Sequence, residues 1–151
     1  MKSIYPLDKI LEPMKPSSVE MSKATHVAKL EEALKDDSKY VVEEKIDGCR
    51  YFLIGDRFFS TRVSEKTGFP VEKTENFPHL VKTFAAAELN HIILDGEICI
   101  PGKKSQDVTT ITGSLPDEAI RKQEEFGWVE YRVFDILRLP NGEWITDRPW
   151  F

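Results

Sequence analysis

Residues 50–62 read RYFLIGDRFFSTR, and this stretch decides the fold. Two apolar runs, 50–54 and 57–62, flank the dipeptide Gly55-Asp56, which is typical of the two-residue turn of a β-hairpin. Another run with strand character lies just before them, over residues 40–46. The pattern therefore predicts a small antiparallel unit built from neighbouring segments of the chain.

The sequence KIDG, residues 45–48, lies at the edge of this unit. Gly48 permits a tight bend soon after the lysine. If the preceding strand continues to residue 47, the side chains of Glu43, Lys45 and Asp47 project from one face, because alternate residues of a strand share a face. A primary amine would then stand between carboxylates.

The remaining segments alternate between helical and strand periodicity. Apolar spacing predicts helices over 22–37, 77–89 and 116–127, a short helix within 103–115, a loop over 64–76, and strands over 91–100 and 128–139. Ser22 or Thr25 is the expected cap of the first helix. Simple alternation in the last strand places Phe134 on the face opposite Val133 and Asp135. We expect an α+β architecture of largely antiparallel sheets flanked by helices.

Composition narrows the class of protein. The 151 residues include 21 Lys and Arg against 26 Asp and Glu, a net charge of −5, and 40% are hydrophobic. No apolar stretch is long enough to span a bilayer, and the two cysteines and three histidines lack zinc-site spacing. We expect a cytoplasmic monomer without a membrane partner. The negative charge argues against a self-sufficient nucleic-acid-binding domain, which normally carries excess positive charge.

The amine of Lys45 has two interpretations. A run of charged residues is usually a solvated face of weak salt bridges. The alternative is a nucleophile, although an ordinary lysine is almost fully protonated at neutral pH and cannot attack in that form. Flanking carboxylates favour the protonated form further, so a nucleophilic lysine requires a divalent cation or another positive charge close by. A nucleotide carrying Mg²⁺ would meet that requirement.

Three other segments carry candidate functional groups. Asp95 and Glu97 share one face of a strand interrupted by Gly96, and a strand glycine often marks the close approach of a ligand or another backbone. Arg62 ends a strand and could grip phosphate. Phe134 could stack on a base. Each also has a structural interpretation: the carboxylates and the arginine could face solvent, and the phenylalanine could belong to the core.

Taken in order, these segments resemble the motifs of the covalent nucleotidyltransferases, which comprise DNA ligases, RNA ligases and mRNA capping enzymes. EKIDGCR, residues 44–50, is similar to the nucleotidyl-lysine motif KxDGxR, and three later segments are similar to the motifs that follow it, namely FFSTR (58–62), LDGEI (94–98) and EYRVFDIL (130–137). SQDVTTITGS, residues 105–114, resembles the corresponding part of small ATP-dependent DNA ligases. The resemblance therefore favours an ATP-dependent DNA ligase and implies an ATP-grasp-like nucleotidyltransferase domain.

The resemblance also implies roles for individual residues. Lys45 would attack the α-phosphate of ATP, and the resulting lysyl-AMP would pass AMP to the 5′-phosphate of nicked double-stranded DNA. The residues implied to hold the nucleotide are Glu43 beside the adenine, Arg50 and Glu97 at the ribose, Phe134 stacked on the base, and Arg62 at a phosphate of the nucleotide or of the nick. Glu97 is also the candidate ligand of Mg²⁺, and Asp47 and Asp95 are candidate supporting groups.

The family continues with an acidic motif, a lysine pair and a basic OB-fold barrel, none of which lies within residues 1–151. We therefore expect a single partial adenylation domain over 1–151 without the C-terminal OB-fold domain, which binds ATP weakly and does not seal nicks alone. Two alternatives stay open. One is an RNA ligase or a capping-type nucleotidyltransferase, and the other is a non-catalytic nucleotide-binding protein.

Overall fold

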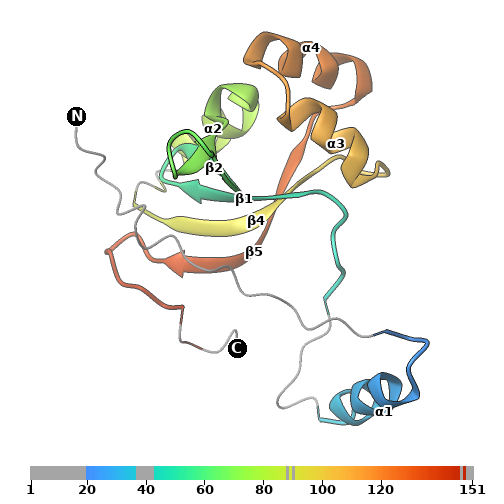
Figure 1. Cartoon of the computed structure of the whole chain (residues 1–151). Coiled ribbons are helices and arrows are strands. Elements are labelled where there is room, and N and C mark those ends of the chain that lie inside the picture. The colour runs from blue at the N-terminus through green and yellow to red at the C-terminus, as the bar shows by residue number, and fades with distance from the viewer. Residues whose placement is uncertain (1–19, 37–42, 88, 90, 147, 149–151) are drawn as a thin grey trace. The chain divides into compact units, whose positions relative to one another are not determined.

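The computed structural model describes residues 20–36, 43–87, 89, 91–146 and 148 (Figure 1). The described residues form two compact units, a smaller one that ends at Lys45 and a larger one that begins at Ile46. The smaller unit contains helix α1, Ala24–Ala33, which has no buried residue. Its N-cap is Lys23 and no side chain caps it, so the prediction of Ser22 or Thr25 as the cap is wrong.

The larger unit is built on one five-stranded antiparallel sheet among the described residues, with strand order β3-β2-β1-β4-β5. Its strands are β1 (Cys49–Ile54), β2 (Arg57–Val63), β3 (Pro70–Glu72), β4 (Ile93–Cys99) and β5 (Glu130–Arg138). The turn between β1 and β2 uses Gly55 at φ 65, a conformation that glycine adopts without strain. The predicted hairpin and the α+β class are confirmed.

The described part of this unit has four helical segments, two between β3 and β4 and two between β4 and β5. They are η2 (Thr74–Asn76), α2 (Pro78–Ala86), α3 (Ser105–Thr112) and α4 (Pro116–Phe126). Figure 1 shows α2, α3 and α4 on one side of the sheet. Side chains from that side, including Tyr51, Leu53 and Phe58, form the core with Phe77 and Ile111. Each fully buried side chain of this size contributes about 1.5–3 kcal/mol.

Three details differ from prediction. The segment 64–76, expected to be a loop, contains β3 and η2. Residues 43–47 form no strand, so Glu43, Lys45 and Asp47 do not share a strand face, and residues 40–42 lie outside the described residues. Along β5 the register shifts beside Asp95 and Gly96, so that Asp95 pairs with Asp135 whereas Gly96 pairs with Val133. Val133 and Asp135 therefore lie on opposite faces, because one extra residue in a strand reverses the alternation.

Helix α4 begins at Pro116 and ends before Gly127, whose φ is 112, as its sequence predicts. A buried polar network holds it in place: the Gln123 amide donates to the Asn76 carbonyl at 2.8 Å, and the Asn76 amide donates to the Ser114 carbonyl at 3.1 Å. Among the described helices, none has both the length and the apolar character required to cross a bilayer.

Candidate functional site

Arg50 and Asp95 form a two-pronged ion pair across β1 and β4. Arg50 Nε donates to Asp95 Oδ1 at 2.9 Å, and Nη2 donates to Oδ2 at 2.5 Å. In the register Asp95 pairs with Phe52, two residues from Arg50, so this is a diagonal pair on one face of the sheet. Hydrogen bonding to Asp95 raises the pKa of the Arg50 guanidinium above its ordinary value.

Glu97 and Phe134 complete this face of the sheet. Glu97 pairs directly with Arg50 in the register of β1 and β4. The Arg50 guanidinium lies over the Phe134 ring, 5.0 Å from its centre, at a distance that permits a cation–π interaction. Asp135 pairs with Asp95 and adds a third carboxylate to the electrostatic surroundings of Arg50. We call these five residues the Arg50 face.

The Arg50 face has the chemistry expected of a nucleoside site. Carboxylates and a guanidinium can hold hydroxyl groups, and an aromatic ring can stack on a base. Arg50 and Phe134, which the resemblance assigns to the ribose and the adenine, are in contact. The structure thus brings together three predicted site residues, Arg50, Glu97 and Phe134.

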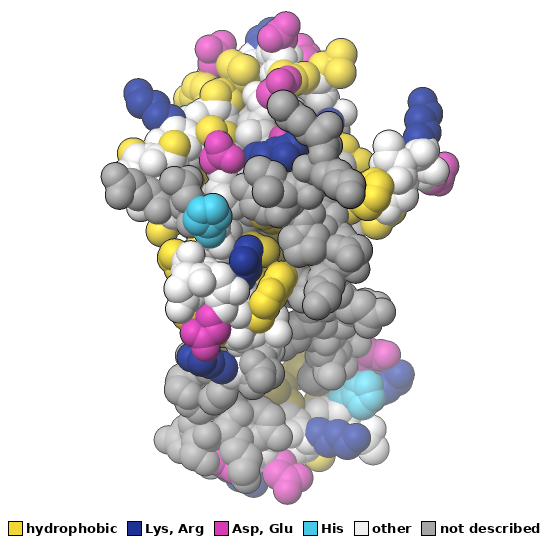
Figure 2. Space-filling view, turned by 90° about the vertical axis from the view of Figure 1, so that its left-hand side faces the viewer, with side chains coloured by type: hydrophobic (Ala, Val, Ile, Leu, Met, Phe, Trp, Pro, Cys, Tyr) yellow, Lys and Arg dark blue, Asp and Glu magenta, His cyan; other side chains and the backbone are white. Residues whose placement is uncertain are grey.

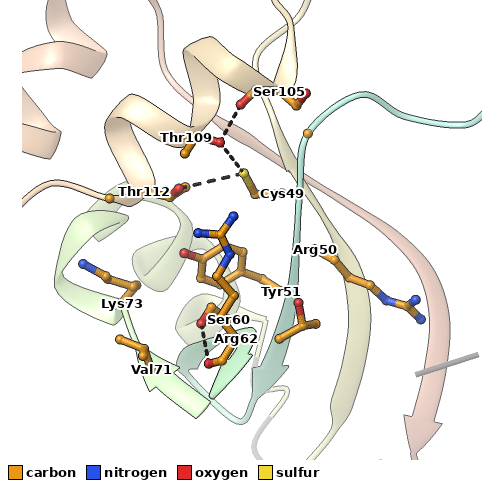
Figure 3. A pocket seen from close by; sticks show the side chains of 13 residues that line it. Cys49, Arg50, Tyr51, Ser60, Arg62, Val71, Lys73, Ser105, Thr109 and Thr112 are labelled. Carbon is orange, nitrogen blue, oxygen red and sulfur yellow. Dashed lines mark hydrogen bonds between the residues drawn. The ribbon is translucent and has the colours of Figure 1, made fainter. Parts of the chain in front are cut away.

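A cavity of about 550 Å³ lies on the other face of the sheet, and we call it the Arg62 cavity (Figure 3). Its lining is rich in hydroxyl groups and in basic side chains: Gly48, Cys49, Arg50, Tyr51, Ser60, Thr61, Arg62, Val71, Lys73, Ser105, Thr109, Thr112 and Gly113. The Cys49 thiol lies 3.4 Å from the Thr109 hydroxyl, with which it can exchange a hydrogen bond, and it accepts a bond from Thr112 at 3.9 Å. Burial raises the pKa of the Tyr51 phenol to about 12.

Strand alternation separates Arg62 from Arg50. Tyr51 pairs with Ser60, and Arg62 lies two residues further along β2, so all three share the face opposite Arg50. Figure 3 shows Arg62 among the cavity residues, whereas the Arg50 side chain points away from them although its residue borders the cavity. The structure therefore does not bring Arg62 together with the other predicted nucleotide-binding side chains of the sheet.

Two glycines of the motifs allow close contact between backbones. A Cβ on Gly48 would lie 2.3 Å from the Ile98 carbonyl oxygen and 2.8 Å from Glu97 Cγ. A Cβ on Gly96 would lie 2.6 Å from the Arg132 carbonyl oxygen and 2.7 Å from the ring of Tyr131. The interpretation of Gly96 as a point of close approach is confirmed, and the neighbour is another strand of the sheet.

Glu43 and Lys45 belong to the smaller unit, where both are exposed and neither lies in a helix or strand.

Two features of the larger unit were not predicted from the sequence. The first is that Asp135 contributes a carboxylate to the Arg50 face, because the bulge in β5 brings it opposite Asp95. The second is the cavity behind Cys49, where the threonines of α3 contact the thiol; their spacing at positions 109 and 112 was the available signal.

Magnesium is implied by the resemblance, and the donor set can be tested against it. Among the described side chains, no group of three His, Cys, Asp or Glu could hold a metal ion. Mg²⁺ in nucleotide sites is commonly held by one or two carboxylates together with substrate phosphates and water. The carboxylate of Glu97 fits the first part of that requirement, and ATP would supply the phosphates.

Basic and acidic side chains are interspersed on the face drawn in Figure 2.

A family model described as the ATP dependent DNA ligase domain matches residues 21–151. No curated protein and no solved structure matches the chain. The match covers all four motifs as well as the α3 segment, and it confirms the family that they indicated. The chain belongs to the ATP-dependent DNA ligase domain family.

Proposed function

We propose that the protein is the adenylation domain of a DNA ligase, that it has the nucleotidyltransferase fold, and that Lys45 is its nucleophile. The Lys45 Nζ bonds to the α-phosphorus of ATP while the bond from that phosphorus to the bridging oxygen breaks. Pyrophosphate departs with the electron pair, and the amine gives up a proton. The product is a phosphoramidate between Lys45 and AMP.

Two further steps would seal a nick. A 5′-phosphate oxygen of the DNA attacks the phosphorus of lysyl-AMP, the nitrogen–phosphorus bond breaks, and the amine regains its proton. The adjacent 3′-hydroxyl then attacks the 5′-phosphate and displaces AMP, which forms the phosphodiester bond. Mg²⁺ bound with the ATP phosphates supplies positive charge that favours the neutral amine and withdraws electrons from phosphorus. Glu97 is the residue that would hold it.

The observation that carries this proposal is the contact between Arg50 and Phe134 beside Glu97. Base, ribose and metal-bound phosphates are joined in that order in ATP, and these side chains offer a partner to each. Lys45 precedes Gly48 by three residues in the lysine motif. Gly48 packs against Glu97 on β4. Glu43, two residues before Lys45, is proposed to lie beside the adenine.

Arg62 is proposed to bind a phosphate of the nicked DNA. Of the two roles that the resemblance left open, its position on the opposite face from Arg50 favours the DNA over the nucleotide. The hydroxyl-rich lining of the Arg62 cavity offers further donors to a phosphodiester backbone.

The test is covalent labelling with ATP that carries the label on its α-phosphate, in the presence of Mg²⁺. We expect label on the protein and an adduct of AMP mass at Lys45. Lys45→Ala should take up no label, and Lys29→Ala, which removes another lysine of the smaller unit, should label normally. Label that persists on Lys45→Ala would exclude this nucleophile. Labelling by GTP where ATP gives none would indicate one of the related enzyme classes. A protein that binds ATP but never takes up label would be a non-catalytic binding protein.

A further inference from the structure

The carboxylate of Asp95 is buried in an environment where a charge requires a partner. Its side chain is 1% exposed, whereas that of Arg50 is 22% exposed. An ionised carboxylate is rarely buried unless it is paired, because desolvation of an unpaired charge is costly. The guanidinium of Arg50 satisfies both oxygens of Asp95 and still reaches the surface of the sheet.

Arg50 is held on two sides. Asp95 holds the guanidinium through two hydrogen bonds, and the guanidinium carbon lies over the Phe134 ring, 5.0 Å from its centre. A planar fork held in this way loses little further freedom when it binds a ligand, and such preorganisation raises affinity. The carboxylates of Asp95, Glu97 and Asp135 raise its pKa, and Arg132 pairs with Glu97 on the same face.

Asp95 itself is poorly placed to touch a ligand. It lies in β4 between β1 and β5 and is almost fully buried, so its contribution to binding must pass through a neighbour. We propose that Asp95 is a positioning residue, which holds the Arg50 guanidinium in the orientation that binds the ribose of ATP. The inference rests on the function proposed above, in which Arg50 binds the ribose.

Binding of ATP to the protein in a Lys45→Ala background tests the proposal by calorimetry, without covalent turnover. We expect Asp95→Asn to raise the Kd for ATP about tenfold, because an amide cannot accept two hydrogen bonds from the fork as the carboxylate does. Asp117→Asn removes an exposed carboxylate at the start of α4 and should leave the Kd unchanged. Asp95→Glu, which keeps the charge, should recover part of the affinity.

Two readouts separate positioning from a purely structural role. In an Arg50→Ala background, Asp95→Asn should weaken ATP binding little further, because the two residues act as a unit. The Asp95→Asn variant should also lose discrimination between ATP and 2′,3′-dideoxy-ATP, which lacks the ribose hydroxyls. Effects of Asp95→Asn that are additive with Arg50→Ala, or unchanged discrimination, would overturn the proposal.

Stability of the variants must be measured alongside. Should Asp95→Asn not fold, Asp95→Glu carries the test, and a Glu variant with normal affinity and normal ribose discrimination would refute positioning. A protein whose Lys45→Ala form binds no ATP at all would instead contradict the proposed function itself. Normal ATP binding that is unaffected by Asp95→Asn contradicts only the role of Asp95.

Discussion

Gly48 lies so close to Ile98 that a Cβ on the glycine would stand 2.3 Å from the Ile98 carbonyl oxygen. This contact joins the KIDG segment to β4, since Ile98 pairs with Cys49 at the start of β1. The obstacle is backbone, which cannot turn aside as a flexible side chain can. The glycine of the motif is therefore required by packing.

Replacing Gly48 by Ala should destabilise the protein by about 1–3 kcal/mol, because the first residues of β1 must shift away from β4. Urea unfolding would measure the loss. The matched control is Gly68→Ala, at φ 70 with nothing within 4 Å of the added Cβ, where only the backbone conformation is unfavourable and the cost should be about 1 kcal/mol. Equal costs at the two positions would contradict the steric explanation.

Phe134→Ala should weaken ATP binding by about 1–3 kcal/mol, the usual contribution of an aromatic side chain stacked on a base. Phe134→Tyr keeps the ring and should bind ATP nearly as well. Trp128→Ala removes an exposed ring that packs against His79 and should not affect the affinity. Fluorescence titration with a labelled ATP analogue would measure all three. Unchanged affinity in Phe134→Ala would place the adenine elsewhere.

Arg62→Ala should impair the DNA steps and spare lysyl-AMP formation, because the Arg62 cavity and the Arg50 face lie on opposite sides of the sheet. Loss of one phosphate contact should reduce the salt dependence of nicked-DNA binding by about one unit of slope. Arg121→Ala is the control: this exposed arginine pairs with Glu118 and Glu125 on α4. Loss of labelling at Lys45 together with normal DNA binding would indicate that Arg62 binds a phosphate of the nucleotide and not of the DNA.

Tyr51 makes stability depend on pH in alkaline solution. Burial raises the pKa of its phenol to about 12, so between pH 10 and 12 the unfolded chain loses this proton while the folded chain keeps it. The free energy of unfolding therefore falls as the pH rises through this window, by about 3 kcal/mol at most from this residue.

Tyr51→Phe should flatten that dependence, which urea unfolding at several pH values between 8 and 12 would reveal. Tyr131, whose pKa burial also raises, remains in both proteins and supplies the residual slope. An identical pH dependence with and without the Tyr51 hydroxyl would show that the phenol ionises as readily in the folded protein as in the unfolded chain.

Local signals predicted the elements that depend on local geometry. The turn at Gly55 and the limits of α4, between Pro116 and Gly127, follow from the conformations that glycine and proline allow. The four motifs likewise indicated Arg50, Glu97 and Phe134 as members of one site, and the structure places them together. These features require no knowledge of which strands are neighbours.

What could not be predicted depends on pairing between distant segments. The bulge in β5 that moves Asp135 beside Asp95 arises from the register with β4, and periodicity within β5 alone suggested unbroken alternation. The predicted strand over 40–46 included Glu43, Glu44 and Lys45, residue types that are depleted in strands, and residues 43–47 form none. To predict that Arg62 and Arg50 lie on opposite faces of the sheet, one must know the register between β1 and β2.

The contact of Gly48 with Ile98 limits changes in chain length near the lysine motif. The hairpin turn and the buried side chains of Tyr51 and Leu53 hold the register of β1, so one amino acid inserted between Gly48 and Arg50 would leave Arg50 opposite Glu97. The insertion would instead move Gly48 away from Ile98 and place a residue that has a Cβ against the Ile98 carbonyl oxygen. The interval from Gly48 to Arg50 is thus fixed by the close contact between this segment and β4, and we expect no length variation there.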